Sequence, residues 1–530
     1  MAEAPEPAGG QPAAGAGPPT AAARGTPLLV SIFVVAACGL VYELLAGTVS
    51  SYLVGDSVYQ FSLVIGLFMA SMGLGAWLSR FAASRLVDRF IALQTVLGVA
   101  GGLSALALFF AFAFVDSYTP FLILSAVAVG TLIGLEIPLV IRILREFQVL
   151  RLNVSNVLTA DYAGALLASV AFPLVLIPQL GLIRTGIVFG LLNLTVAALA
   201  LWTFRAEVAR PRRLGLAIGA GALVLGVALA LAGRFTGVFE ARLYGAEIIL
   251  AESTPYQRIV VTRSGPAVSL FLNGGLQFNT LDEHRYHESL VQPAMSLAGR
   301  REQILILGGG DGLALREVLR HPEVAAVTLV DLDPRMTALF STNALLSALN
   351  GHVFDDPRVE VRNEDAWKFL EGETRRFDVV IIDLPDPYDV NLSRLYTVAF
   401  YALVARRLNA DGVMVTQATS PTFAREAFWS IERTMADAPS PYEAAPGLAT
   451  IPYHAYVPSF GDWGFVLAAS RGLDWSAVRA PAGMRFLSPA VIAGMTAFPP
   501  DSGPLEVEPN SLETHALVRY YEAGWGRWYE

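Results

Sequence analysis

The sequence predicts a multi-domain protein: an N-terminal α-helical bundle that crosses a membrane, then a small β-subdomain and an α/β domain with a parallel sheet. Hydrophobic residues make up 54% of the 530 residues and charged residues only 16%, a composition typical of chains with membrane segments. Long apolar runs fill residues 27–234, whereas short apolar strands alternate with helical patterns from 303 to about 418. The length itself indicates more than one domain.

The chain begins with residues 1–26, a stretch of Ala, Pro and Gly with few charges, which we expect to be disordered. This stretch lacks the basic start of a secretory signal. Because the apolar run after it is also long, we expect no cleavage.

About seven membrane-spanning helices should follow, because each apolar run is close to the roughly 20 residues that a bilayer requires. Their Gly and Ala content suits close packing of helices in lipid. The predicted spans lie near 27–47, 58–79, 91–115, 119–141, 157–178, 182–203 and 214–233.

Several ionisable side chains lie within or beside these spans. Arg142 can place its guanidinium at the membrane interface. For Glu43, Glu136 and Asp161 two interpretations stay open, namely pairing between helices and lining of a polar cavity.

Arginines gather in the loops after the second, fourth and sixth predicted spans. The positive-inside rule places these loops, and the N-terminus, in the cytoplasm. With seven crossings the C-terminal domain would then lie outside. The three clusters are Arg80, Arg85 and Arg89; Arg142, Arg145 and Arg151; and Arg205, Arg210, Arg212 and Arg213.

Net charge also divides the chain: residues 1–235 carry +3 and the remainder −12, which together make the −9 of the whole. An acidic soluble half argues against nucleic-acid binding and is compatible with a cationic substrate, although a solvated acidic surface would look the same. The single cysteine, Cys38, lies in an apolar run, which excludes an intrachain disulfide and a cysteine metal cluster. We expect no metal site.

Residues 235–285 predict a linker and the small β-subdomain, with strands around 248–250, 259–261 and 268–272. Residues 286–470 predict the α/β domain. Residues 471–530 form a C-terminal extension, which ends in an amphipathic stretch from Leu512 to Tyr521 that should pack on the domain.

The α/β domain is organised around residues 304–319, which have the pattern of a strand, a tight glycine turn and a helix. Gly308 and Gly310 let the backbone approach a ligand closely, and the helix N-terminus offers free N–H groups. Asp331 ends the next strand 20 residues after Asp311, the usual spacing for a carboxylate that binds ribose hydroxyls. The pattern therefore predicts a Rossmann-like nucleoside site.

Three more carboxylates, Asp365, Asp383 and Asp386, follow later apolar strands. Ligands in such sheets bind beyond the carboxyl ends of the strands. Any one of these residues alone would be explained by a turn or a helix cap. Together with Asp311 and Asp331 they favour one shared crevice.

These motifs resemble the spermidine synthases of the polyamine aminopropyltransferase family, over roughly residues 245–470. The fusion to a membrane bundle resembles the membrane-type bacterial members. The resemblance implies a methyltransferase-like Rossmann fold, a homodimer, and a multi-pass protein of the bacterial cell membrane. The matching stretches are 253–257 (STPYQ), 273–277 (NGGLQ), 282–288 (DEHRYHE), 308–319 (GGGDGLALREVL), 383–387 (DLPDP), 395–401 (LYTVAFY) and 417–421 (QATSP).

The implied reaction moves an aminopropyl group from decarboxylated S-adenosylmethionine to putrescine or a related polyamine, giving spermidine and methylthioadenosine without a further cofactor. A primary amine has a pKa of about 10 and is protonated at neutral pH, so it must lose a proton before it attacks carbon. By match to the family motif, Asp383 is the base that accepts this proton. The resemblance places Tyr286, His287, Asp386 and Gln417 on the amine side, and Gln257, Gln277, Gly308, Gly310, Asp331, Asp365 and Ala366 around the cosubstrate.

Asp311 favours aminopropyl transfer over methyl transfer. Intact S-adenosylmethionine carries a carboxylate that Asp311 would repel. The decarboxylated form keeps only its amine at that place, and Asp311 would attract it, so we count Asp311 among the amine-binding residues.

Two classes of function stay open: an aminopropyltransferase, and a membrane carrier or sensor that binds polyamines without turnover. The Asp383–Asp386 pair favours the enzyme. A methyltransferase is a more distant third. Departures from the family pattern at Asn273, at Leu384-Pro385 and within 453–461 leave the choice of amine open. Because the implied cosubstrate is made in the cytoplasm, we expect a cytoplasmic catalytic domain, against the charge rule.

Overall fold

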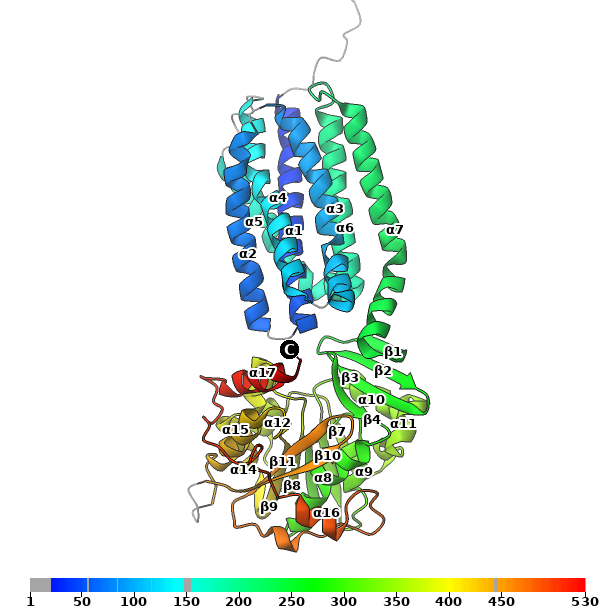
Figure 1. Cartoon of the computed structure of the whole chain (residues 1–530), viewed down its shortest axis with the longest axis vertical. Helices are drawn as coiled ribbons and strands as arrows, with labels where there is room; N and C mark the ends of the chain where they lie inside the picture. The colour runs from blue at the N-terminus through cyan, green and yellow to red at the C-terminus, as the bar shows by residue number, and fades with distance from the viewer. Residues whose placement is uncertain are drawn as a thin grey trace, which may run out of the picture. The chain divides into compact units, whose positions relative to one another are not determined.

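The computed structural model describes residues 21–54, 57–82, 84–115, 117–146, 154–442 and 447–529, and the chain divides into two units after Glu240. Figure 1 shows long helices in the first unit and sheets with covering helices in the second. Most of the tail predicted to be disordered lies outside the described residues. Helix α1 begins at Ala21, however, so residues 21–26 are helical.

The first unit consists of long apolar helices joined by short connections. Pro173 lacks a backbone N–H, and the turn that contains it widens into a π-helix, η2. The elements are α1 (Ala21–Val54), α2 (Ser57–Leu78), η1 (Ser79–Phe81), α3 (Leu86–Phe114), α4 (Thr119–Glu146), α5 (Val154–Ala171), η2 (Phe172–Leu176), α6 (Ile177–Thr203) and α7 (Pro211–Tyr244).

Within the described residues, 6 helical stretches are long and apolar enough to cross a membrane. The sequence predicted about seven spans. The two predicted segments 157–178 and 182–203 fall in the single stretch Ser155–Thr203, which accounts for the difference in number. Gly181, with a φ of +74°, breaks the helical backbone inside this stretch. The stretch has 49 residues, about twice the roughly 20 that one span requires, so it is long enough to contain both predicted segments.

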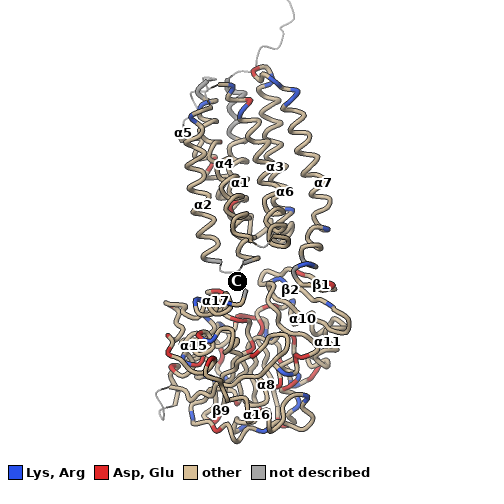
Figure 2. Tube along the Cα trace, viewed as in Figure 1, with Lys and Arg blue, Asp and Glu red and all other residues tan. Residues whose placement is uncertain are grey.

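The loops after α2 and α6 lie beside the ends of α4 and α3 at one end of the helical unit. Arg142, near the end of α4, donates to the Ser79 carbonyl at 2.7 Å, and Asp88 at the start of α3 accepts from the Ala209 N–H at 3.1 Å. In Figure 2 the Lys and Arg positions of this unit concentrate at that end of the Cα trace. Arg142 therefore lies beside the loop that carries the first arginine cluster, and Asp88 lies beside the loop that carries the third.

Glu136 is buried in the helical unit and pairs between helices. Its carboxylate accepts a hydrogen bond from Gln94 Nε2 of α3 at 2.7 Å. This is one of the two interpretations left open for Glu136. Glu43 and Asp161 are only partly buried, and both interpretations stay open for them.

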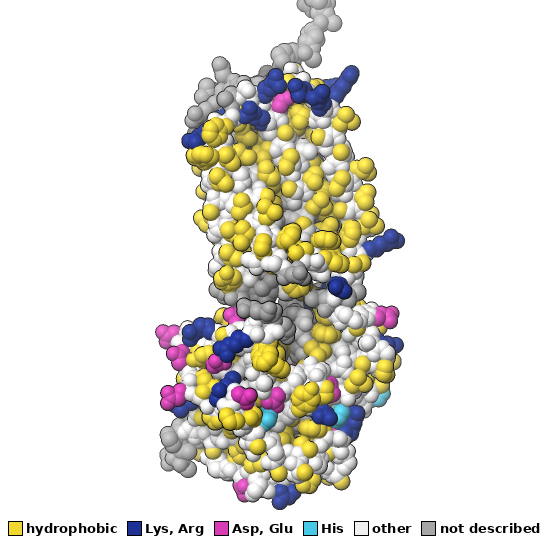
Figure 3. All heavy atoms as spheres, viewed as in Figure 1, with side chains coloured by type: hydrophobic (Ala, Val, Ile, Leu, Met, Phe, Trp, Pro, Cys, Tyr) yellow, Lys and Arg dark blue, Asp and Glu magenta, His cyan; other side chains and the backbone are white. Residues whose placement is uncertain are grey.

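Large apolar side chains cover the outside of the helical unit, as Figure 3 shows for one face. Leu124 on α4 is 66% exposed, Leu174 in η2 is 70% exposed and Leu223 on α7 is 69% exposed. A water-soluble protein rarely presents such a surface.

The second unit contains two sheets. The smaller is antiparallel in the order β1-β2-β3-β4, and the larger has the order β10-β11-β9-β8-β5-β6-β7. In the larger sheet β7, β6, β5, β8 and β9 are parallel, while β11 and β10 are antiparallel to their neighbours. The strands are β1 (Glu247–Ser253), β2 (Arg258–Ser264), β3 (Ala267–Leu272), β4 (Gly275–Asn279), β5 (Gln303–Gly308), β6 (Ala326–Val330), β7 (Val359–Arg362), β8 (Phe377–Asp383), β9 (Leu408–Gln417), β10 (Ala449–Val457) and β11 (Gly461–Ala469).

Helices cover both faces of the larger sheet, so its central strands are buried on both sides. Ile304 and Ile306 of β5 enter the apolar core on one face, and Leu305 and Leu307 enter the core on the other. The helices and helical turns are α8 (Glu283–Leu297), α9 (Leu313–Val318), α10 (Pro334–Thr342), α11 (Ala344–Asn350), η3 (Val353–Asp355), α12 (Ala366–Gly372), α13 (Val390–Ser393), η4 (Arg394–Tyr396), α14 (Val398–Arg406), α15 (Arg425–Ala436), η5 (Trp475–Ala477), α16 (Pro489–Gly494) and α17 (Ala516–Tyr529).

The C-terminal extension packs on this unit through α17. Leu517 is fully buried in the core that also contains Leu305 and Leu307. A Cβ on Gly524 would lie 2.6 Å from Ala424 Cα, so the helix approaches the start of α15 closely.

Candidate active site

The glycine turn and Asp383 lie side by side at the carboxyl ends of β5 and β8. Gly308 is the register partner of Asp383, and the Gly309 N–H donates to the Asp383 carbonyl at 3.0 Å. Gly308 has a φ of +84°, and a Cβ there would lie 2.1 Å from that same carbonyl oxygen. Only glycine fits this position, because a side chain would force the two strand ends apart.

Asp331, directly after β6, holds the middle of the turn. Its carboxylate accepts from the Gly310 N–H at 3.0 Å and from the Asp333 N–H at 2.9 Å. A Cβ on Gly310 would lie 2.5 Å from Asp331 Oδ2. Burial raises the pKa of Asp331 to about 6, although these two bonds oppose the shift.

Asp333 connects Gln257 to Asp331 by hydrogen bonds. The motifs did not single out Asp333. Asp333 is buried and accepts from Gln257 Nε2 at 3.1 Å and from Thr254 Oγ1 at 2.8 Å. It also caps α10, since its side chain accepts from the Arg335 N–H. The sequence signal that could have identified Asp333 is the second carboxylate in Asp331-Leu332-Asp333, directly after β6.

Asp311 is buried at the start of α9, where its carboxylate accepts from the Leu313 N–H at 2.8 Å. Burial raises its pKa to about 6; the charge of His287 opposes this shift and the charge of Asp383 adds to it. Asp311, His287 and Asp383 therefore form one electrostatic group.

Tyr286 and His287 reach this group from α8. The Tyr286 hydroxyl donates to Asp383 Oδ1 at 2.7 Å. Burial raises the pKa of Asp383, while the charge of His287 and the bond from Tyr286 lower it. The tyrosine thus orients the carboxylate and favours its charged form.

His287 is held by a buried ion-pair chain. Its Nδ1 lies 3.0 Å from Glu283 Oε2, which in turn lies 2.9 Å from Arg316 Nη2. Burial alone would lower the pKa of His287, but the hydrogen bond and charge of Glu283 outweigh it and raise the pKa to about 9. His287 is therefore cationic at neutral pH, which favours the charged forms of Asp311 and Asp383.

Asp386 lies three residues beyond Asp383 and takes its hydrogen bonds from the end of β9. Gln417 Nε2 donates to Oδ1 at 3.0 Å, and Thr419 Oγ1 donates to Oδ2 at 3.1 Å. Burial raises the pKa of Asp386 to about 6 against bonds from Gln417, Tyr521 and Thr419. The motifs had included Gln417 in the site but not Thr419 or Tyr521.

Three of the predicted residues are not linked to this group by the hydrogen bonds or ion pairs of the described residues. Asp365 caps α12 by accepting from the Lys368 N–H at 3.1 Å, and it also pairs with Arg394. Ala366 is the first residue of that helix. Gln277 donates to the Gly275 carbonyl of its own strand at 3.1 Å. Within the described ranges, no hydrogen bond joins Asp365 or Gln277 to the other site carboxylates.

Two of the three departures from the family pattern, at Asn273 and within 453–461, have structural explanations. Asn273 adopts a φ of +49°, a conformation that Asn tolerates, and its side chain accepts from the Arg258 N–H at 2.9 Å. Tyr453 is fully buried, and its hydroxyl donates to the Ser289 carbonyl at 2.9 Å. Tyr453 therefore belongs to the core and not to the amine side.

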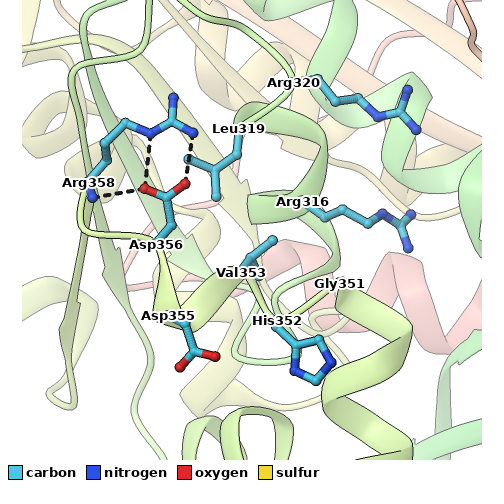
Figure 4. A pocket seen from close by; sticks show the side chains of 9 residues that line it. All are labelled: Arg316, Leu319, Arg320, Gly351, His352, Val353, Asp355, Asp356 and Arg358. Carbon is cyan, nitrogen blue, oxygen red and sulfur yellow. Dashed lines mark hydrogen bonds and ion pairs between the residues drawn. The ribbon is translucent and has the colours of Figure 1, made fainter.

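A pocket of about 450 Å³ lies away from these carboxylates, between α9 and the loop that leads into β7 (Figure 4). Its arginines are already paired: Arg320 with Glu317 at 3.0 Å and Arg358 with Asp356 at 2.8 Å. Among the residues that the structure describes, no group of three or more His, Cys, Asp or Glu side chains is placed to hold a metal ion. The pocket is lined by Arg316, Leu319, Arg320, Gly351, His352, Val353, Asp355, Asp356 and Arg358.

Comparisons with known proteins show what this chain is similar to. Residues 283–470 match the family model described as a spermine/spermidine synthase domain. Polyamine aminopropyltransferase 2 of Ralstonia nicotianae is 48% identical over 515 residues, covering 95% of this chain and 99% of that protein. The polyamine aminopropyltransferase of Leptospira interrogans is 43% identical over 506 residues, with the same two coverages. A crystal structure of spermidine synthase with the transition-state analogue AdoDATO aligns with a TM-score of 0.42 and 25% identity, over 48% of this chain and 85% of that one.

Proposed function

Because this chain belongs to the polyamine aminopropyltransferase family, we propose that Asp383 and Asp386 form the amine side of its active site, and that Asp311 and Asp331 bind the cosubstrate. The activity predicted from the motifs is confirmed: the protein is an enzyme that transfers an aminopropyl group from decarboxylated S-adenosylmethionine to an amine. The alternative, a carrier or sensor without turnover, is not favoured by these relatives.

In the proposed reaction the attacking nitrogen forms a bond to the propyl carbon beside the sulfonium, and that carbon–sulfur bond breaks. Methylthioadenosine leaves with the electron pair of the broken bond. The nitrogen must carry a free lone pair, so it gives a proton to Asp383. The raised pKa of Asp383 makes this carboxylate a better proton acceptor than an exposed aspartate.

Each neighbour of Asp383 has a proposed part. Tyr286 orients the base through its 2.7 Å hydrogen bond. A cationic His287 would repel an ammonium group, so we assign it to keeping Asp311 and Asp383 charged and not to direct amine binding. Asp386 attracts the cationic diamine, and Gln417 positions the Asp386 carboxylate through a hydrogen bond.

On the cosubstrate side, Gly308 and Gly310 leave room for the nucleoside, and Asp331 binds its ribose hydroxyls. Asp311 attracts the propylamine group. We also propose that Gln257, Gln277, Asp365 and Ala366 bind the cosubstrate, as in the family; in the structure Gln277 donates to the Gly275 carbonyl and Asp365 caps α12.

The observation that supports this assignment most directly is the register of β5 and β8, which sets the cosubstrate turn at Gly308 beside the proposed base Asp383. The test uses purified full-length protein with decarboxylated S-adenosylmethionine and a panel of diamines and polyamines, monitored for methylthioadenosine. Release that depends on the added amine supports the assignment. Absence of release with every amine of the panel contradicts it.

We propose further that the helical unit lies in the bacterial cell membrane as a multi-pass bundle. The support is its outer surface, where side chains such as Leu124 and Leu223 are mostly exposed and where lipid would cover them. We place the catalytic unit in the cytoplasm, where the cosubstrate is made, and expect a homodimer, which sedimentation in detergent would test.

The domain limits predicted from the sequence remain proposals: 27–234 for the bundle, 235–285 for the linker and β-subdomain, 286–470 for the catalytic domain and 471–530 for the extension. The structural division after Glu240 falls within the proposed linker.

A further inference from the structure

We propose that the C-terminal helix α17 completes the acceptor-amine site, with Tyr521 and Trp525 positioning Asp386 and forming a wall for the methylene chain of a diamine. This inference rests on the proposed function, because it takes Asp383 and Asp386 as the amine side. It adds a segment that lies outside residues 283–470, the part of the chain that matches the family model.

Hydrogen bonds connect α17 to Asp386 by two routes. Trp525 Nε1 donates to Thr419 Oγ1 at 3.2 Å, and Thr419 Oγ1 donates to Asp386 Oδ2 at 3.1 Å. The Tyr521 side chain hydrogen-bonds Asp386 directly. Helix α17 therefore helps to set both the position of the Asp386 carboxylate and the direction of its free lone pairs.

Thr419, the link between Trp525 and Asp386, is held in an unfavourable backbone conformation. Its φ is +53°, which is rare for a β-branched residue. Its N–H donates to Gln417 Oε1 at 3.0 Å, and its carbonyl accepts from the Gly464 N–H at 2.6 Å. Strained residues persist where the surrounding contacts over-determine them, and they cluster at functional sites. Here the strain directs the hydroxyl toward Asp386.

Aromatic rings connect the two site carboxylates. At one end Tyr286 donates to Asp383, and at the other end Tyr521 bonds Asp386. Aromatic faces attract ammonium groups and offer apolar surface to a methylene chain. A diamine, with charged ends and an apolar middle, has the matching chemistry. Successive ring centroids lie 5.9 Å apart for Tyr286–Phe460, 5.0 Å for Phe460–Trp463, 6.3 Å for Trp463–Trp525 and 6.1 Å for Trp525–Tyr521.

The test compares full-length variants in detergent, each with a matched control on the same helix. Tyr521→Phe removes the hydroxyl, and Trp525→Phe removes the N–H donor. The controls are Tyr520→Phe and Trp528→Phe. The Tyr520 hydroxyl accepts from the Glu508 N–H, and the Trp528 side chain is largely exposed. We measure kcat, the KM for putrescine and, by calorimetry, the affinity for methylthioadenosine.

Tyr521→Phe and Trp525→Phe should each raise the putrescine KM about tenfold. The first removes a hydrogen bond to the Asp386 carboxylate, and the second removes the N–H that holds the Thr419 hydroxyl toward that carboxylate. The affinity for methylthioadenosine should stay within about twofold, which also shows that the variants are folded. As a further readout, Thr419→Ser, which keeps the hydroxyl, should retain a lower putrescine KM than Thr419→Ala.

A putrescine KM in both test variants equal to that of the controls would overturn the inference. Failure of the proposed function looks different: Asp383→Asn would then retain turnover, whatever the α17 variants do. If Asp383→Asn is inactive and the α17 variants match the controls, only the part assigned to the helix is wrong.

Discussion

At the scale of single residues, Asp383 is the side chain on which the proposed chemistry depends most. Asp383→Asn keeps the shape but removes the proton acceptor, so kcat should fall at least about a thousandfold. Binding of methylthioadenosine, measured by calorimetry, should change little. Asp501→Asn, at an exposed position, is the surface control. A variant with near-normal kcat would show that another group takes the proton.

Asp311 is the residue that should distinguish the two forms of the cosubstrate. Asp311→Asn removes an attraction for the propylamine of the decarboxylated form and a repulsion of the carboxylate of the intact form. The ratio of the two affinities should therefore shift by about tenfold or more toward intact S-adenosylmethionine. Calorimetry with both ligands measures this ratio. An equal loss for both would mean that Asp311 does not face the propylamine.

The carboxylates also predict a dependence on pH. Burial raises the pKa of Asp386 to about 6, so this group loses its charge, and its attraction for a diamine, as the pH falls through that value. Below about pH 6 we expect kcat/KM for putrescine to fall, by no more than about tenfold for each pH unit. Putrescine itself stays protonated there, since its amines have a pKa of about 10. A flat profile between about pH 7 and pH 5 would contradict the assignment.

Linkage gives the opposite sign for stability. The folded pKa of Asp386 lies above the unfolded value of about 3.9, so ionisation of this residue disfavours the fold. Its contribution to the free energy of unfolding is most favourable below about pH 3.9 and is lost as the pH rises through about 6. Asp386→Asn should remove this part of the pH dependence in thermal unfolding.

At the scale of elements, the glycine turn places the nucleoside side of the site. Gly310→Ala would set a Cβ 2.5 Å from Asp331 Oδ2, so the turn or the carboxylate must move. We expect methylthioadenosine affinity to fall by about tenfold or more, because ribose binding depends on that carboxylate.

Gly372→Ala at the end of α12 is the matched control for the turn, since nothing lies within 4 Å of a Cβ there. It should bind methylthioadenosine normally. If Gly310→Ala also binds normally, the close approach of the turn to Asp331 is not needed for the ligand.

At the scale of the whole molecule, the side of the membrane that holds the catalytic unit can be measured directly. Cys38→Ala removes the only native cysteine, and Gly472→Cys places a thiol where nothing lies within 4 Å of a Cβ. With a cytoplasmic catalytic unit, an impermeant maleimide should label this position only after lysis. Ala206→Cys, in an arginine-rich loop, is the companion position for the charge rule. Labelling of Gly472→Cys in intact cells would place the unit outside.

The sequence by itself determined the fold class of both units and the reaction that the protein carries out. Apolar runs of membrane length and alternation of strands with helices are local patterns, and the helices from α1 to α7 and the strands from β5 to β9 follow them. The motifs also placed Asp331 and Asp383 at strand ends beside the glycine turn, because parallel strands bring their carboxyl ends to one edge.

Only the tertiary structure decided which partner each side chain meets. Asp365 looked like its neighbours along the chain but caps α12 and pairs with Arg394, whereas Asp386 receives bonds from Thr419 and Tyr521. The cap by Asp365 is a local contact, but no local pattern indicates the contacts of Asp386, because they depend on the pairing of β11 with β9 and on the packing of α17 against the start of α15. Periodicity records which face a residue occupies, but strand order and helix docking decide what lies opposite that face.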